Sequence, residues 1–281
     1  MSEVNGKITN LGIYRKDTCV FVMKTVRLIK KYFEYVHTKV KVMYKQKRFC
    51  CDGVILKYMC NKVKTSDTLV IVFSSCTRKG IPARYNYVRT LEKTDCNRLY
   101  ILDDFGEDRR GSYYLGHMPE FKEQEAAIEL VKNFIDKLNP KKVVFCGSCK
   151  GGYVALNIGS RFKDSIMIIG EPTYKIATEF KLSDALLRYW MGEVTDENIK
   201  TIDAYLTKQL ENNEFKNSQK IHIFYSTCDE YIERHTIPLL NDLRKYGYCL
   251  EEETADFSTH ADLGLYFSDY LKRKVQDIII E

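Results

Sequence analysis

From residue 66 onwards, short apolar runs alternate with amphipathic stretches. Strands read as continuous apolar runs when helices cover both faces of a parallel sheet. We expect strands at Thr68–Phe73, Arg98–Asp103, Lys142–Cys146, Ser165–Gly170, Lys220–Tyr225 and Cys249–Thr254. Helices are expected at Pro119–Leu138, Gly151–Phe162, Tyr231–Tyr246 and Asp262–Ile279. Right-handed crossovers between such strands give a doubly wound, mostly parallel sheet, so the fold class is α/β.

Residues 1–65 have a different character. Apolar and polar residues alternate at Phe33–Tyr44, FEYVHTKVKVMY, which predicts an antiparallel β-rich section. This section holds 15 Lys and Arg against 4 Asp and Glu, although the whole chain carries a net charge of only +6. The alternation favours a solvated, lysine-rich strand face, and an anionic partner is the alternative. We therefore divide the chain into this section and an α/β domain at 66–281.

The stretch at residues 176–218 interrupts the alternation of strands and helices. Two or three helices are expected there, between two strands. One apolar stripe runs through it, formed by Leu182, Leu186, Leu187, Trp190 and Met191. An insertion at this place is a candidate helical cap over a substrate site, although such a stripe is also typical of ordinary core packing.

Composition narrows the cellular setting. No apolar run approaches the roughly 20 residues of a membrane span, and the start MSEVNGKITN lacks the apolar core of a signal peptide. We therefore expect a cytoplasmic protein with no transmembrane segment and no nucleic-acid partner. Ten cysteines at irregular spacing fit reduced thiols better than a disulfide framework, and no second Cys or His pair accompanies Cys50 and Cys51 to form a zinc site. The oligomeric state stays open.

The segment KVVFCGSCKGGYVAL, at residues 142–156, has two interpretations. Cys146 and Cys149 form a C-x-x-C motif, as in thiol oxidoreductases. Alternatively, Gly147 to Gly151 form a G-x-nucleophile-x-G turn between a strand and a helix, with cysteine at the centre. Glycines directly after the second cysteine weaken a redox-active helix, whereas a nucleophile elbow needs small flanking residues. We favour the elbow, with Cys149 as nucleophile and Ser148 as a bystander.

An acid and a histidine follow the elbow in the order that this architecture uses. Asp229 comes after the strand at Lys220–Tyr225, and His260 comes after the last strand. We therefore predict a triad of Cys149, Asp229 and His260, with Asp256 and Glu230 as substitute acids. Cys149 would attack an acyl carbonyl, and His260 would accept the thiol proton. The oxyanion would be bound by the backbone N–H of Lys150 and by that of Ser75, preferred here to Ser74.

Three segments carry a family resemblance: FCGSCKGGYVAL at the elbow, ARYNYVRTL at residues 83–91 and LDDFGEDRRGSYYLG at residues 102–116. Together they resemble the α/β-hydrolase-like proteins of bacterial cell-surface glycan and capsular polysaccharide clusters. That group is related to the carbohydrate O-acetylation component of the accessory Sec export system. The resemblance implies an α/β-hydrolase fold and acyl transfer or deacylation on a glycan, with nucleophile, acid and histidine at Cys149, Asp229 and His260. Other polysaccharide-assembly proteins are then possible partners.

The chain departs from this group at the nucleophile, because the usual elbow has serine where Cys149 stands. Dienelactone hydrolases have a similar G-x-C-x-G-G turn, and a thioester intermediate hands its acyl group readily to an alcohol or amine. The charged segment LDDFGEDRRG is either a solvated loop or part of the substrate site. Its Asp104 and Arg109, with Arg84 and Tyr85 of ARYNYVRTL, are candidate substrate-binding residues.

The expected activity is therefore that of an esterase or acyltransferase acting on a cell-surface or capsular saccharide, through a covalent acyl-enzyme. It needs no cofactor and no metal, because the acidic spacing matches no calcium loop. The alternative is a catalytically weak or inactive hydrolase-fold partner in a polysaccharide-assembly complex.

Overall fold

The computed structural model describes residues 40, 42, 44–180 and 184–281. The chain divides into two compact units, Met1–Gln46 and Lys47–Glu281. In the first unit the described residues 40, 42, 44 and 45 are helical, so the strand expected at Phe33–Tyr44 is wrong for them. A helix satisfies its own backbone hydrogen bonds, whereas a strand needs a neighbour. The rest of that expected strand lies outside the described residues.

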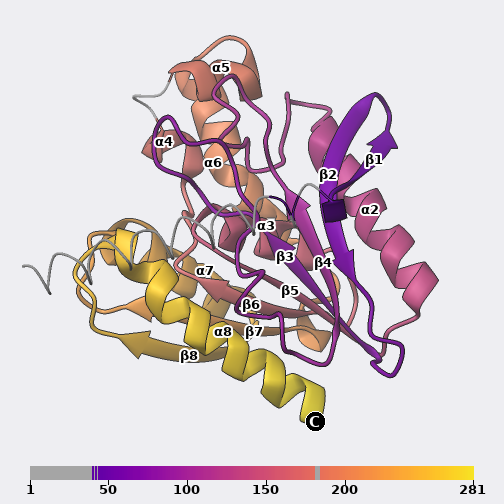
Figure 1. The fold of residues 1–281 in the computed structure, drawn as a ribbon. Helices are drawn as coiled ribbons and strands as arrows, with labels where there is room; N and C mark the ends of the chain where they lie inside the picture. Colours follow the sequence, from indigo (N-terminus) through magenta and orange to yellow (C-terminus); the bar gives the residue numbers. More distant parts are fainter. Residues whose placement is uncertain (1–39, 41, 43, 181–183) are drawn as a thin grey trace, which may run out of the picture. The chain divides into compact units, whose positions relative to one another are not determined.

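The described part of the second unit forms one eight-stranded sheet with the order β1-β2-β4-β3-β5-β6-β7-β8 (Figure 1). The strands are β1 (Lys47–Cys51), β2 (Val54–Asn61), β3 (Thr68–Phe73), β4 (Asn97–Leu102), β5 (Lys142–Ser148), β6 (Ile166–Gly170), β7 (Lys220–Ser226) and β8 (Cys249–Ala255). The pairs β1–β2 and β2–β4 are antiparallel, and all other neighbours are parallel. Each of the six predicted strands is confirmed to within two residues at either end.

The boundary expected at residue 65 is shifted towards the N-terminus. Strand β2 pairs with β4 from Lys57–Leu102 to Asn61–Arg98, and β1 pairs with β2. The α/β unit therefore begins at Lys47 rather than at residue 66. Strand β1 lies at the edge of the sheet and β2 next to it, and partly exposed strands alternate in polarity and carry lysines. Their sequence therefore differs from that of the buried strands although they belong to the same sheet.

Helices cover both faces of the sheet. They are α2 (Lys122–Leu138), α3 (Lys150–Gly159), α7 (Ile237–Tyr246), which continues a π-helical turn at Ile232–Thr236, and α8 (Leu263–Ile280). A Cβ on Gly159 of α3 would meet Met167 of β6, whereas a Cβ on Gly170 of β6 would meet Phe267 of α8. Met167 and Gly170 are an odd number of positions apart in one strand, so they face opposite sides. Helices α3 and α8 thus lie on opposite faces.

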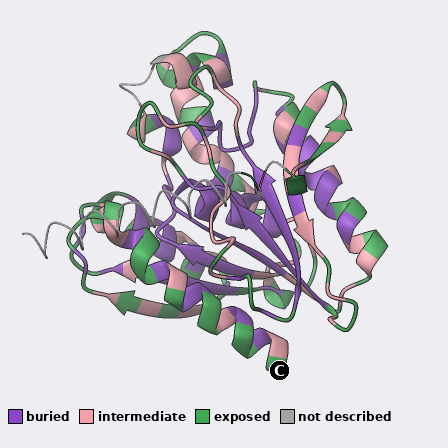
Figure 2. Cartoon of the chain, viewed as in Figure 1, coloured by how far each residue is buried: buried purple, intermediate pink, exposed green. Residues whose placement is uncertain are grey.

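The main hydrophobic core lies on the α3 face. It joins alternate residues of the central strands, such as Leu69, Ile71 and Phe73 of β3, with buried residues of α2, α3 and α7. Figure 2 shows the central strands buried, while the outer sides of α2 and α8 are exposed. Burial on both faces explains why the sequence of these strands is continuously apolar.

The predicted insertion between β6 and β7 contains helices α4 (Ile176–Glu179), α5 (Asp184–Met191) and α6 (Asp196–Glu211), followed by a 3-10 turn at Lys216–Ser218. Helix α6 joins the main core through Ile202, Leu206 and Leu210. Helix α5 buries Trp190, whose indole N–H donates to the carbonyl of Ser112 at 2.9 Å. Of the expected stripe, Leu187, Trp190 and Met191 are buried, and Leu182 lies outside the described residues.

Strand β5 and helix α3 approach so closely that no side chain fits between them. A Cβ on Gly147 would lie 2.5 Å from the backbone carbonyl carbon of Gly151. We expect Gly147→Ala to lower the free energy of unfolding by about 2 kcal/mol or more, because backbone rather than a flexible side chain must move. Gly264→Ala is the control, since a Cβ there meets nothing within 4 Å in a helix that favours alanine over glycine. Urea unfolding of both variants measures this, and equal stabilities would contradict the close approach.

Candidate active site

Cys149 stands at the turn between β5 and α3 in a strained conformation. Its φ is +52° and its ψ is −118°, a region that residues other than glycine seldom occupy. The turn therefore has the geometry that the G-x-nucleophile-x-G interpretation predicts. The neighbouring Ser148 hydroxyl is hydrogen-bonded to the Tyr87 hydroxyl at 2.5 Å, as expected of a bystander.

The thiol of Cys149 lies among side chains from other strand ends. Its Sγ is 3.6 Å from Thr173 Oγ1, in the loop after β6. The Cys76 side chain, in the loop after β3, and the backbone N–H of Lys150 both lie close enough to shift the pKa of this thiol. The oxyanion role of the Lys150 N–H stays a prediction. The side chain of Cys149 is thus placed at the carboxyl edge of the sheet, where ligands bind in open α/β folds.

The two thiols titrate as a pair. The pKa of Cys76 is lowered to about 6, mainly by Cys149 and with contributions from the charges of Lys150 and Arg110, while desolvation opposes the fall. Cys76, together with burial, raises the pKa of Cys149 well above its usual value. Loss of the first proton therefore leaves a negative charge on the exposed Cys76, which keeps the buried Cys149 protonated.

His260 is held by two carboxylates. Its Nδ1 lies 3.1 Å from Glu171 Oε2, at the end of β6, and 3.5 Å from Asp229 Oδ2, after β7. The side chains of Glu171 and Asp229 are fully buried, and the side chain of His260 is 15% exposed. Ionised carboxylates at Nδ1 fix the ring orientation and the tautomer and stabilise the imidazolium form.

Backbone donors hold each carboxylate in place. The N–H of Ser226 donates to Glu171 Oε1, and the N–H of Tyr231 donates to Asp229 Oδ1 at 2.7 Å. Burial raises the pKa of Glu171, and Asp229 raises it further, although the contact with His260 works against that rise. Glu171 Oε2 is hydrogen-bonded to His260 Nδ1, whereas Asp229 Oδ2 faces the same nitrogen at 3.5 Å without a hydrogen-bond partner in the described part of the chain.

The other ring nitrogen of His260, Nε2, is buried and has no hydrogen-bond partner among the described residues. The Tyr231 ring stacks on the imidazole with centroids 3.7 Å apart and planes 9° apart. This stacking leaves the ring little room to turn. With Nδ1 bound to carboxylates, Nε2 is the atom available to accept a proton.

The acid nearest the histidine differs from the one that the sequence predicts. Asp229 does face His260, but Glu171 lies closer to the ring nitrogen. Of the suggested substitutes, Asp256 accepts a hydrogen bond from Thr227 instead, at 2.9 Å. Glu171 follows β6 directly, so its position at a strand's carboxyl end is the signal that would have identified it.

Glu171, Asp229 and His260 are also the one grouping of potential metal ligands found in the described residues. One ligand atom from each lies within 4.8 Å of the others. Three such donors suit a divalent ion. The backbone N–H groups that already occupy one oxygen of each carboxyl fit the role of histidine support equally well. The absence of a metal stays a prediction.

Lys150 anchors the elbow to the loop after β4. Its Nζ lies 2.8 Å from Asp103 Oδ2, and the two side chains are 1% and 0% exposed. Asp103 also accepts hydrogen bonds from the N–H groups of Ser112 and Tyr114, at 2.9 and 3.2 Å. The close packing leaves room only for glycine at position 111, where a Cβ would lie 1.9 Å from Lys150 Nζ. One acidic residue of LDDFGEDRRG thus has a structural role.

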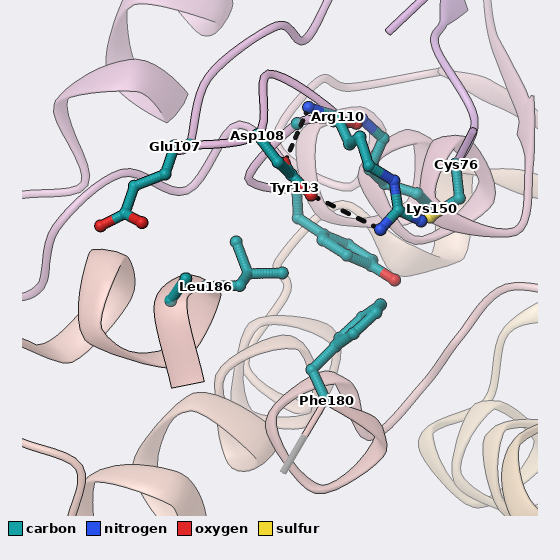
Figure 3. A pocket seen from close by; sticks show the side chains of 11 residues that line it. Cys76, Glu107, Asp108, Arg110, Tyr113, Lys150, Phe180 and Leu186 are labelled. Atoms are coloured by element: carbon teal, nitrogen blue, oxygen red, sulfur yellow. Dashed lines mark hydrogen bonds and ion pairs between the residues drawn. The ribbon is translucent and has the colours of Figure 1, made fainter. Parts of the chain in front are cut away.

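A cavity of about 110 Å³ opens beside the thiols (Figure 3). Cys76, Lys150 and Arg110 lie on one side of it, Phe180 and Leu186 of the insertion lie on the other, and Tyr113 stands between them. Glu107 and Asp108 also line it, so the cavity has a wall with charges of both signs and an apolar wall, with Cys76 at its border.

The other predicted site residues are only partly gathered here. None of Asp104, Arg109, Arg84 and Tyr85 lines this cavity, while their neighbours Asp108 and Arg110 do. Asp104 instead pairs with Lys57 and with Arg109. The N–H of Ser75 donates to Asn86 Oδ1 at 2.9 Å, so its use in an oxyanion hole requires Asn86 to release it. These assignments remain predictions.

Sequence comparison gives the family. Residues 100–273, more than half of the chain, match the profile described as "Uncharacterised protein family (UPF0227)". The chain belongs to this family. No curated protein sequence matches it. The matched region of this UPF0227 member runs from β4 to α8 and includes the elbow, both carboxylates and His260.

Solved structures similar to this UPF0227 chain share its fold. The capsule O-acetyltransferase of Neisseria meningitidis serogroup A, as a mutant in complex with CoA, has a TM-score of 0.70 at 23% identity, covering 82% of this chain and 95% of its own. The Glycosylation Associate Protein (Gap123) complex of Streptococcus agalactiae has a TM-score of 0.68 at 17% identity. The match covers 83% of this chain and 47% of that chain. An S-formylglutathione hydrolase of Agrobacterium tumefaciens has a TM-score of 0.57 at 14% identity. The match covers 82% of this chain and 94% of that chain. The α/β-hydrolase fold and the resemblance to capsular O-acetylation proteins are confirmed.

The helices of the described chain lack the character of membrane spans. None of those in residues 40, 42, 44–180 and 184–281 combines the length and the hydropathy that a membrane crossing requires.

Removing one partner of the Lys150–Asp103 pair should leave a buried charge uncompensated. We expect Lys150→Met to lower the free energy of unfolding by about 3–5 kcal/mol. The matched control is Lys132→Met, which breaks an exposed pair with Glu129 and should cost less than about 1 kcal/mol. Chemical denaturation compares them, and an equally small loss in both variants would contradict a structural role for the buried pair.

Proposed function

We propose that this protein is an acyltransferase, with esterase activity when water replaces the acceptor, and that Cys149 carries the acyl group. The observation that supports this most strongly is a strained cysteine at a strand–helix turn, together with a histidine held by two buried carboxylates at neighbouring strand ends. This combination of groups suits covalent acyl chemistry.

In the proposed reaction, Cys149 Sγ attacks the carbonyl carbon of an acyl donor while His260 Nε2 accepts the thiol proton. The tetrahedral oxyanion is stabilised by the Lys150 N–H. Collapse expels the leaving group, which takes the proton from His260, and a thioester on Cys149 remains. An acceptor hydroxyl, deprotonated by His260, then attacks the thioester and restores the thiol.

The acceptor that we propose is a hydroxyl of a capsular or cell-surface saccharide. The structural similarity to a capsule O-acetyltransferase supports this choice, and so does the sequence resemblance to capsular cluster proteins. A coenzyme A thioester is a suitable donor probe, because that acetyltransferase was solved with CoA. The cavity bordered by Cys76 offers an apolar wall and, in Arg110 and Lys150, two cations for such a donor.

A second candidate is a catalytically weak partner in a polysaccharide-assembly complex. The similarity to the Gap123 complex supports it. So does the thiol contact of Cys149 with Cys76 and Thr173, since both contacts compete with the histidine. The variants below separate the two candidates.

Replacement of the nucleophile tests the proposed function. We expect Cys149→Ala to lower kcat for transfer from acetyl-CoA to a saccharide, or for hydrolysis of a chromogenic acetyl ester, by about 10³-fold or more. Cys146→Ala is the matched control and should keep most of the activity, because Cys146 lies fully buried within β5. Activity lost through Cys146 instead would favour the dithiol interpretation. Wild-type protein inactive on every donor tested would favour the non-catalytic partner.

Replacement of the two carboxylates beside His260 tests their roles separately. Because Glu171 and Asp229 both contact His260 Nδ1, we expect Glu171→Gln or Asp229→Asn alone to lower kcat/KM about 10- to 100-fold, with the larger loss at the closer Glu171. The double variant should lose about 10³-fold or more. Steady-state kinetics with circular dichroism as a folding control measures this. Full activity of Glu171→Gln beside an inactive Asp229→Asn would show that Asp229 alone supports the histidine, as the sequence predicts.

A further inference from the structure

Two thiols meet at the carboxyl edge of the sheet. Cys76 follows β3 and Cys149 follows β5, and these are adjacent parallel strands with Val72 paired to Cys146. The loops after adjacent parallel strands emerge side by side. The two thiols lie close enough for each to shift the pKa of the other, and both cysteines are free in this structure.

The two cysteines differ in exposure. Cys149 is only 8% exposed, whereas Cys76 is exposed and borders the cavity beside Lys150 and Arg110. A small molecule that enters the cavity therefore meets Cys76, whereas Cys149 does not line the cavity.

The two thiols also differ in acidity, and the more exposed one is the more acidic. The pKa of Cys76 is lowered to about 6 by the contact with Cys149 and by the two neighbouring cations, so Cys76 is largely a thiolate at neutral pH. Cys149 keeps its proton because the same contact raises its pKa. An accessible thiolate beside a second thiol is the arrangement found in peroxide-sensing cysteine pairs.

We propose that Cys76 and Cys149 are a peroxide-sensitive pair, which closes to a disulfide and thereby masks the elbow thiol. The Cys76 thiolate attacks one oxygen of a hydroperoxide, the O–O bond breaks, and the other oxygen leaves as water or an alcohol after protonation. Cys76 is then a sulfenic acid. The sulfur of Cys149 displaces its hydroxyl, which leaves as water with the Cys149 proton, and an S–S bond forms. The pair loses two electrons, and a dithiol reductant returns them.

The C-x-x-C motif therefore identifies one of the two cysteines but not its partner. Cys146 is fully buried in β5, and burial raises its pKa, so it lacks both the access and the thiolate character that an oxidant requires. Cys76 is distant in sequence and has no motif around it. The fold brings it to Cys149.

The test treats the full-length protein with hydrogen peroxide, blocks remaining thiols with N-ethylmaleimide, and maps peptides by mass spectrometry. The expected product is a peptide pair linked through Cys76 and Cys149, which dithiothreitol separates. The linkage should form in Cys146→Ala and be absent from Cys76→Ala. A Cys146–Cys149 linkage would overturn the proposal. So would over-oxidation of Cys76 with no linked peptide, or a Cys76 that stays reduced while exposed Cys228 is oxidised.

The effect on acyl transfer rests on the proposed function, whereas the disulfide itself does not. Peroxide should lower the activity of the wild type at least about tenfold, reversibly with dithiothreitol, and Cys76→Ala should show no such reversible loss relative to its own reduced form. A linked peptide in a protein without acyl transfer would refute the proposed function and leave the pair standing. Protein that transfers acyl groups but forms no linked peptide would refute the cysteine pair and leave the proposed function standing.

Discussion

The close approach of strand β5 to helix α3 is the constraint on which the site depends. A Cβ at Gly147 would collide with Gly151, and one at Gly151 would lie 2.8 Å from the carbonyl oxygen of Phe73. Because Gly147 and Gly151 have no side chains, the chain can reverse within a few residues and hold Cys149 at a positive φ. The turn places its thiol beside Thr173, in the loop after β6, and the carboxylates after β6 and β7 face His260, so the positions of these groups follow from the sheet order.

Buried charge organises the remainder of the site. Lys150 and Asp103 neutralise each other beneath the cavity, and Glu171 and Asp229 share the imidazole of His260. Ionised groups in a buried setting need such partners, because the loss of hydration is otherwise too costly. The same proximity sets the unequal acidity of Cys76 and Cys149. Catalysis as proposed and sensitivity to oxidants therefore draw on one cluster of groups.

Much of the architecture was predictable from the sequence, because burial on both faces makes strands such as Thr68–Phe73 continuously apolar. The positions of Asp229 and His260 after their strands were predictable for the same reason. Strands β1 and β2 were assigned to a separate section, since alternating polarity does not reveal which sheet a strand joins. Glu171 was missed because only the three-dimensional fold shows that it lies nearer to His260 than Asp229 does. Cys76 was missed because it carries no local motif.

The central claim is that the elbow thiol becomes acylated. Brief incubation of reduced protein with an activated acetyl ester, acid quenching and peptide mass spectrometry tests it most directly. The account predicts one acetyl group, removable by hydroxylamine, on the peptide that contains Cys149 and on no other thiol. Its amount should rise when His260 is intact and the acceptor is omitted. An acetyl group found on Cys76 instead, or an unmodified Cys149 in protein that turns over the ester, would contradict the account.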